Sequence, residues 1–259
     1  TRDNGAIWYG AEIFKFEPGY LWAIGNNYNG RNALSLPETS QYSSPVQVGG
    51  GWSTNASVSA SANKSHATEG DAAMMKGGTL WAWGVGGYGQ LGYNNRTTVS
   101  SPIQVPGTTW QTLSIAGGNA TSKSSIRTDG TLWSWGRNDQ GQLGQSNTTY
   151  YSSPVQIPGT TWKASFQCGT VGAGTKTDGT LWTWGKNQTG ALGQNNTTAY
   201  SSPKQVPGTS WDAVAGGWDE NLFVLRTDGT LWSLGKNSNG QLGQNNRTYY
   251  SSPVQIPGT

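Results

Sequence analysis

Paired tryptophans are the side chains of this sequence whose type and spacing most plainly invite a chemical role. Trp133 and Trp135 lie two residues apart in the phrase LWSWG, and residues two apart on a strand point to the same side. Such a pair could absorb light, stack on a sugar ring or fill the space between sheets. Elsewhere the phrase reads LWAIG and LWSLG. Because an aliphatic residue replaces a core side chain better than a chromophore, we favour packing.

The ionisable and metal-binding residues form no recognisable catalytic set. Hydrolysis by paired carboxylates needs two acids a defined distance apart, whereas Asp129, Asp178 and Asp228 each precede a glycine at a predicted hairpin turn. His66 has no companion at the spacing of a catalytic triad, and with Cys168 it cannot supply a multi-ligand zinc site. We therefore predict a non-enzymatic protein with no catalytic residue, metal or cofactor.

The composition indicates an all-β protein. The 259 residues include 39 Gly, 14 Trp and 11 Tyr, with 11% charged residues, which suits many short strands and tight turns. The net charge of +3 is spread without a run of Lys or Arg, so we do not expect nucleic acid as a partner. No segment has about 18 consecutive apolar residues, so we expect no membrane insertion.

Two phrases recur together along the chain at intervals of 49 to 59 residues. The phrase Leu-Trp-x-x-Gly has its first tryptophan at Trp22, Trp81, Trp133, Trp182 and Trp232. The phrase Ser-Ser-Pro-x-Gln has its proline at Pro45, Pro102, Pro154, Pro203 and Pro253. Two phrases with one period indicate a repeated structural unit.

Each unit reads as four short strands. The strand SSPxQ is followed by a strand that opens on a tryptophan, and then by a hairpin whose turn glycine is Gly130, Gly179 or Gly229. Such a unit cannot bury both sheet faces alone, so neighbouring sheets must stack. A radial stack gives a β-propeller. A linear β-solenoid is the alternative, although its rungs are usually shorter.

The chain is expected to form one propeller domain over residues 1–259. The units are predicted at 1–44, 45–101, 102–153, 154–202 and 203–252. Because the first unit lacks its opening phrase, residues 253–259 are predicted to complete the first blade. The expectation is about five four-stranded blades, closed by strands from both termini.

The unit TDGTLWSWGRNDQGQLGQSNTTYYSSPVQIP resembles the repeat of the regulator of chromosome condensation family. The resemblance implies a β-propeller, and covers nearly the whole chain. The family includes a nuclear exchange factor for a small GTPase, a plant ultraviolet-B receptor, a secreted bacterial inhibitor of β-lactamase, and bacterial and phage surface proteins. The nearly verbatim units look most like this last group. The family's usual histidine before the hairpin turn is missing, and its usual ring has seven blades.

The loops rich in Asn and Tyr, such as QSNTTYYSS, suggest two roles. Tyrosine rings and amides can stack on and hydrogen-bond to sugars, which would make Tyr150, Tyr200 and Tyr249 glycan-binding residues. Asn and Thr also stabilise turns by bonding their own backbone, and this structural role is favoured. Several stretches match the glycan acceptor pattern Asn-x-Ser/Thr, at Asn95, Asn147, Asn196 and Asn246.

The units differ most between the unit-opening tryptophan and the hairpin turn. Stacking constrains framework positions, whereas a surface adapted to an asymmetric partner should vary between blades; unconstrained loop drift would also produce variation. We predict a partner-facing edge that includes segments 52–77, 119–122 and 218–221. The candidate partner-binding residues on it are Trp52, His66, Asn119, Trp218, Asp219 and Glu220.

These patterns predict a protein-interaction or structural module on an extracellular, cell or virion surface, such as a fibre, spike or decoration component. A neighbouring structural subunit or a surface receptor is the expected partner. The alternatives are a soluble inhibitor or receptor that binds one protein through a propeller edge, and a glycan-binding module.

Overall fold

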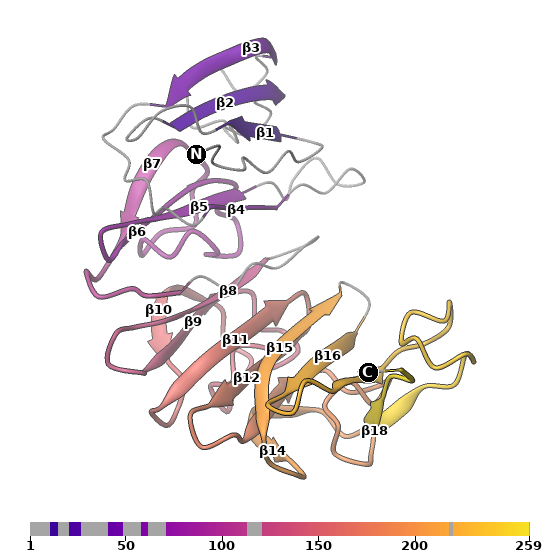
Figure 1. Cartoon of the computed structure of the whole chain (residues 1–259). Helices are drawn as coiled ribbons and strands as arrows, with labels where there is room; N and C mark the ends of the chain where they lie inside the picture. The colour runs from indigo at the N-terminus through magenta and orange to yellow at the C-terminus, as the bar shows by residue number, and fades with distance from the viewer. Residues whose placement is uncertain are drawn as a thin grey trace.

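The computed structural model describes residues 11–14, 21–26, 41–48, 58–61, 71–112, 121–217 and 220–258. These residues form antiparallel sheets and contain no helix, so the all-β prediction is confirmed. Figure 1 shows the sheets following one another along an open arc, with β1–β3 at one end and β15–β18 at the other.

Five sheets are built from strands that are consecutive in sequence, and the strand order in each follows the chain. The first contains β1 (Ala11–Phe14), β2 (Leu21–Asn26) and β3 (Gln41–Val48). The second contains β4 (Val58–Ser61), β5 (Asp71–Lys76), β6 (Thr79–Gly84) and β7 (Val99–Val105). The third contains β8 (Ser122–Ile126), β9 (Leu132–Gly136) and β10 (Tyr151–Gln156). The fourth contains β11 (Trp162–Cys168), β12 (Val171–Lys176), β13 (Leu181–Gly185) and β14 (Tyr200–Val206). The fifth contains β15 (Trp211–Gly217), β16 (Asn221–Arg226), β17 (Leu231–Gly235) and β18 (Tyr250–Gln255).

The Ser-Ser-Pro strand closes a sheet instead of opening one. It pairs with the preceding Leu-Trp strand, as Val155 does with Ser134 and Val254 with Ser233. The predicted unit 154–202 is therefore displaced by one strand from the sheet 162–206. A terminal strand also suits the phrase physically, because proline lacks an N–H and is tolerated at a sheet edge.

The predicted blade shared by the two termini is not what the strand pairing shows. Gln255 pairs with Trp232, so β18 completes the fifth sheet. The assignment of 253–259 to the first blade is therefore wrong for residues 253–255. The physical reason is that a single loop connects β17 to β18, so the two strands can pair as neighbours in the same sheet. Closure into a ring of five blades, and a single domain over 1–259, stay predictions.

The hairpin turns explain the recurrent aspartates. Gly130 has φ of +76°, a conformation that glycine adopts without strain. Asp129 Oδ1 accepts hydrogen bonds from the backbone N–H and hydroxyl of Thr131, at 3.0 and 2.6 Å. The Thr131 hydroxyl in turn accepts from Trp133 Nε1 at 2.8 Å. The turns at Asp178 and Asp228 repeat this chain of bonds, so these carboxylates hold turns and tryptophans in place.

These turns predict an acid-sensitive stability. Hydrogen bonds from the threonine hydroxyl, and then from its backbone N–H, hold the pKa of Asp129, Asp178 and Asp228 below the ordinary 3.8. As pH falls the unfolded chain is protonated first, so this stabilisation is present above 3.8 and is lost as pH falls through the folded-state pKa. The melting temperature should therefore drop as pH falls below about 4 and through the lowered folded-state pKa. In thermal scans the melting temperature of the triple variant Asp129→Asn, Asp178→Asn, Asp228→Asn should fall less over the same pH range. A fall equal to that of the unaltered chain would contradict this role of the aspartates.

A cation lies between two tryptophans beside each of these turns. The Arg127 guanidinium carbon lies 4.4 Å from the Trp110 ring centre and 4.0 Å from that of Trp133. Lys176 lies in the same way against Trp162 and Trp182, and Arg226 against Trp211 and Trp232. We call the end of the sheets that carries these turns (residues 127–131, 177–180 and 227–230) the turn edge. Its chemistry is nearly the same in three successive units.

Neighbouring sheets join through one repeated contact. The loops after β6, β9 and β13 each donate a backbone N–H to the Ser-Ser-Pro strand of the next sheet: Asn94 to Ser152 O, Ser146 to Ser201 O and Asn195 to Ser251 O, each at 2.7 Å. A glycine in the same loop lies against that serine, and a Cβ on Gly89, Gly141 or Gly190 would lie 2.6 to 2.8 Å from its Cα. These glycines let two backbones approach closely.

The second tryptophan of the pair is buried at the same junctions. Trp135 Nε1 donates to Gln90 O of the preceding sheet at 2.9 Å, and Trp184 Nε1 donates to Gln142 O at 2.7 Å. Both rings are at most 1% exposed. In the fifth sheet Leu234 takes this place and is also fully buried. The pairs thus act in packing between sheets.

Candidate functional site

The opposite end of the sheets, which we call the loop edge, carries the long loops and the turns between the first two strands of a sheet. Its described residues include 137–149, 186–199 and 236–249, together with 169–170 and Glu220. The strand pairing places them together, because Gly235 pairs with both Asn221 and Tyr250. The described residues of the predicted segments 119–122 and 218–221 therefore share this edge with the Asn/Tyr-rich loops.

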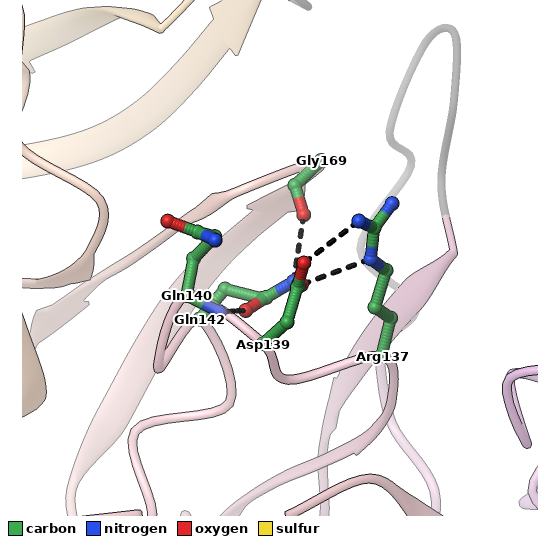
Figure 2. Close-up of polar contacts among 5 residues, drawn as sticks. All are labelled: Arg137, Asp139, Gln140, Gln142 and Gly169. Carbon is green, nitrogen blue, oxygen red and sulfur yellow. Dashed lines mark hydrogen bonds and ion pairs between the residues drawn. The ribbon is translucent and has the colours of Figure 1, made fainter. Parts of the chain in front are cut away.

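A charged cluster at this edge joins the third and fourth sheets (Figure 2). Arg137 donates to Asp139 through Nε at 2.9 Å and through Nη2 at 2.7 Å. Gln142 Nε2 donates to Asp139 Oδ1 at 3.3 Å and to Gly169 O, in the β11–β12 turn, at 3.2 Å. Figure 2 shows Asp139 between Arg137 and Gln142, with Gln140 pointing away from Arg137.

The cluster keeps Asp139 ionised. Burial raises the pKa of Asp139, but the hydrogen bonds from Arg137 and Gln142 together with the Arg137 charge outweigh this and hold the pKa below its ordinary value. An ionised carboxylate that accepts hydrogen bonds from two side chains is suited to fixing the loop. It is poorly suited to accepting a proton near neutral pH.

At the next junction the cation equivalent to Arg137 pairs with a carboxylate of the following sheet. Lys186 Nζ lies 2.6 Å from Glu220 Oε1, and the Thr189 hydroxyl donates to Glu220 Oε2 at 3.1 Å. Glu220 has φ of +56°, and its carbonyl accepts from Lys236 N at 3.0 Å. The candidate partner-binding residue Glu220 thus lies on the predicted edge, where it also links the fourth and fifth sheets.

An aromatic and arginine cluster joins the second and third sheets at the same edge. The rings of Tyr88 and Tyr150 meet edge to face, with centres 6.0 Å apart. The Arg137 guanidinium lies 5.3 Å from the Tyr88 ring centre, and that of Arg96 lies 5.6 Å from that of Tyr150. The sequence reasoning missed Tyr88, Arg96 and Arg137. Aligning the units would show Tyr88 against Gln140 and Thr189, but no sequence signal brings these loops together.

The three candidate glycan-binding tyrosines lie in different environments. Tyr150 is half-buried in the cluster just described. Tyr200 packs against the core of the fourth and fifth sheets, and its hydroxyl accepts from Asn196 Nδ2 at 3.3 Å. Tyr249 is 46% exposed. The geometry therefore gives Tyr200 a packing role, while glycan binding by Tyr150 and Tyr249 stays a prediction.

Several sequence candidates lie outside the described residues, namely Trp52, His66, Asn119, Trp218 and Asp219. Their assignment stays a prediction. Within the described part of the chain, no three His, Cys, Asp or Glu residues gather in a way that could hold a metal ion. The same residues contain no helix long and apolar enough to cross a membrane.

Comparison with known proteins gives partial sequence relatives. Human E3 ubiquitin-protein ligase HERC2 is 31% identical over 87 residues, which are 34% of this chain and 2% of that protein. The Protein RCC2 homolog of Danio rerio is 36% identical over 72 residues, which are 28% of this chain and 14% of that protein. The chain thus spans a small part of these relatives.

Solved structures agree over nearly the whole chain. Human WBSCR16 is 19% identical with a TM-score of 0.79, over 95% of this chain and 65% of that one. Prp20p from Saccharomyces cerevisiae, described with its binding to Gsp1p and histones, is 16% identical with a TM-score of 0.76, over 96% and 62%. At these identities the likeness shows the fold alone. It agrees with the predicted all-β propeller, while the number of blades and their closure stay predictions.

The family comparison covers more than half of the chain. The model of the regulator of chromosome condensation (RCC1) repeat matches residues 77–122, 129–170, 178–224 and 228–259. Each matched stretch contains a Leu-Trp strand and the loop that follows it. The chain belongs to the regulator of chromosome condensation (RCC1) repeat family.

Proposed function

We propose that this chain is a protein-interaction module that binds its partner through the loop edge. The observation that carries the proposal is a contrast between the two ends of the same sheets. At the turn edge three successive units repeat the Asp-Thr-Trp bonds and the cation between two tryptophans. At the loop edge Arg137 pairs with Asp139 of its own loop, whereas the equivalent Lys186 pairs with Glu220 of the next sheet.

This contrast favours the loop edge for a physical reason. Stacking identical sheets requires identical contacts, so the turn edge can be explained by stability alone. A protein partner presents an asymmetric surface, and binding it requires a different side chain from each unit. Tyrosine and arginine, which cluster at Tyr88, Tyr150, Arg96 and Arg137, are enriched at protein interfaces.

The charges of the loop edge indicate what kind of protein surface would fit. Its described residues carry more cations than carboxylates, and Asp139 and Glu220 are both paired with cations of this chain. Arg96 and Arg247 are exposed. We therefore propose a partner with an acidic contact surface, whose binding should weaken as salt screens the charges.

Photo-crosslinking within one unit tests this placement. A benzoylphenylalanine at Gln188, exposed on the loop edge, is compared with one at Asp178, exposed on the turn edge of the same sheet. In cells that express the chain naturally, Gln188 should give a specific protein adduct that diminishes with added salt, and Asp178 should not. An adduct from Asp178 with none from Gln188 would contradict the proposal.

The wider setting of this function stays a prediction. An extracellular, cell-surface or virion location, and a structural subunit as partner, rest on composition and on the near-identity of the units. The relatives reported above come from human, zebrafish and yeast, and their likeness gives these assignments no support.

A further inference from the structure

The loop that follows β6 departs from the later loops of the loop edge at three places at once. The later units repeat a buried asparagine, a glutamine and a tyrosine, namely Asn138, Gln145 and Tyr151; Asn187, Gln194 and Tyr200; and Asn237, Gln244 and Tyr250. The loop after β6 has Gly86, Tyr93 and Val99 instead. Since three units stack with the same residues, stacking does not require this departure.

The departure changes what holds the tip of the loop. In the later units the buried asparagine donates to a carbonyl of the tip, as Asn138 Nδ2 does to Thr149 O at 3.0 Å. After β6 the equivalent carbonyl, Thr97 O, lies where such a side chain would begin, because a Cβ on Gly86 would be 2.1 Å from it. The Tyr93 hydroxyl donates to Thr97 O at 2.9 Å. The second unit thus builds its tip in a different way.

This tip, residues 93–97, which we call the arginine tip, is held against the third sheet. Asn94 N donates to Ser152 O at 2.7 Å. Arg96 Nη2 donates to Tyr150 O at 3.3 Å, and the Arg96 guanidinium lies 5.6 Å from the Tyr150 ring centre. The Arg96 side chain is therefore in place before a partner arrives, which lowers the cost of ordering it on binding.

Arg96 differs in its charge environment from the other cations of this edge. Ion pairs within the chain engage Arg137 and Lys186, whereas no carboxylate among the described residues pairs with Arg96. Its side chain is exposed. A guanidinium carries five N–H donors, and Tyr150 O accepts from one of them. The donors that remain can bind a carboxylate through two parallel hydrogen bonds.

Two tyrosine rings provide an apolar surface beside this guanidinium. Tyr88 and Tyr150 are both half-buried, and their rings meet edge to face. A hydrogen bond between charged groups is stronger where neighbouring rings exclude water. The rings can also pack against the methylene groups of an acidic side chain, so the arrangement suits an aspartate or a glutamate better than a free inorganic anion.

We propose that Arg96, together with the Tyr88 and Tyr150 rings, is the anchor that binds an aspartate or glutamate side chain of the protein partner. The inference rests on the proposed function, because it takes the loop edge as the binding surface. A carboxylate is favoured over a phosphorylated side chain, since recognition of phosphate generally uses several arginines. The ionised Asp139 beside Arg137 would also repel the double charge of a phosphate more strongly.

Photo-crosslinking beside the anchor tests its place. Benzoylphenylalanine at Thr98, which is exposed and close to Arg96 in sequence, should capture the same protein as position 188, and adding Arg96→Gln should remove this adduct. An adduct at position 188 with none at position 98 would overturn the anchor and leave the proposed function standing. Failure at both positions would overturn both.

Affinity measurements with the captured protein test the chemistry of the anchor. Arg96→Gln should weaken binding at least about tenfold, and Arg96→Lys should have an intermediate effect because it keeps the charge and loses the planar fork. The matched control is Lys204→Gln, which removes an exposed cation that lies over the Tyr200 ring on the outer strand β14. It should bind like the unaltered chain. An equal loss for both Gln variants would contradict the anchor, because net charge alone would then explain the loss.

A double-mutant cycle identifies the group that Arg96 binds. Each aspartate and glutamate in the partner segment crosslinked at position 98 is replaced by alanine, and its affinity is measured with the unaltered chain and with Arg96→Gln. One replacement should weaken binding as much as Arg96→Gln does, and the two changes together should weaken it no further. Additive losses for every acidic residue would overturn the proposal. So would a loss of binding after phosphatase treatment of the partner, which would identify a phosphorylated side chain as the occupant.

Discussion

Replacing Trp184 by Ala is expected to lower the free energy of unfolding by about 3–5 kcal/mol. The ring is fully buried, meets Trp162 edge to face at 6.0 Å between centres, and donates its indole N–H to Gln142 O at 2.7 Å. Gly172 lies so close that a Cβ there would be 2.1 Å from Trp184 Nε1. The substitution would leave a large cavity and an unpaired carbonyl at a junction between sheets. Urea unfolding followed by circular dichroism measures the loss.

Two further variants separate the causes of this loss. Trp182→Ala, two residues earlier on the same strand, removes a half-buried ring that lies against Lys176. It should lower the free energy of unfolding clearly less than Trp184→Ala does. Trp184→Leu should cost an intermediate amount, because the fifth sheet uses Leu234 at this place but leucine cannot bond to Gln142. A loss for Trp184→Ala that does not exceed that for Trp182→Ala would contradict the role assigned to the second tryptophan.

Gly190→Asn is expected to lower the free energy of unfolding by about 2–3 kcal/mol, because the added side chain overpacks the junction between two sheets. Its Cβ would lie 2.6 Å from Ser251 Cα and 3.0 Å from Ser251 N, and backbone cannot move aside as the end of a flexible side chain can. Positive φ itself contributes little, since Asn tolerates that region. Chemical denaturation with a dilute, monomeric sample measures the change.

Gly240→Asn is the matched control for Gly190→Asn. The two glycines occupy equivalent places with nearly equal φ, +77° and +79°, but the first has open space where the second meets the next sheet. The difference between the two variants therefore isolates the close approach of two sheets. Equal losses of unfolding free energy would show that the backbone conformation, and not the junction between sheets, explains why glycine recurs at this place in the repeat.

The repeat made most of the fold predictable. Two phrases with one period located the five Leu-Trp strands, and the Asp-Gly turns located the hairpins. The sequence could not decide which sheet receives the Ser-Ser-Pro strand. This strand has the same alternating pattern whether it opens a unit or closes one, and only its pairing, as of Val155 with Ser134, distinguishes the two.

The candidate site was harder to predict than the fold. The variable segments indicated the loop edge, which contains Glu220, but the contacts there form between units. Tyr88 meets Tyr150, and Gln142 bonds to Gly169, across junctions whose residues are distant in sequence. Tyr150, Tyr200 and Tyr249 looked alike because the Asn/Tyr-rich loops are alike. Tyr200 instead occupies the place of Tyr151 and Tyr250, whose hydroxyls accept from the loop asparagine.

The central claim is tested most directly by hydrogen–deuterium exchange on the complex of this chain with the protein identified by crosslinking at position 188. If the partner binds the loop edge, amides in 137–142, 186–191 and 236–241 should gain protection on binding, while those in 127–131, 177–180 and 227–230 should exchange as in the free chain. Protection confined to the turn edge would contradict the account, because the surface that is repeated in three units would then be the one that binds.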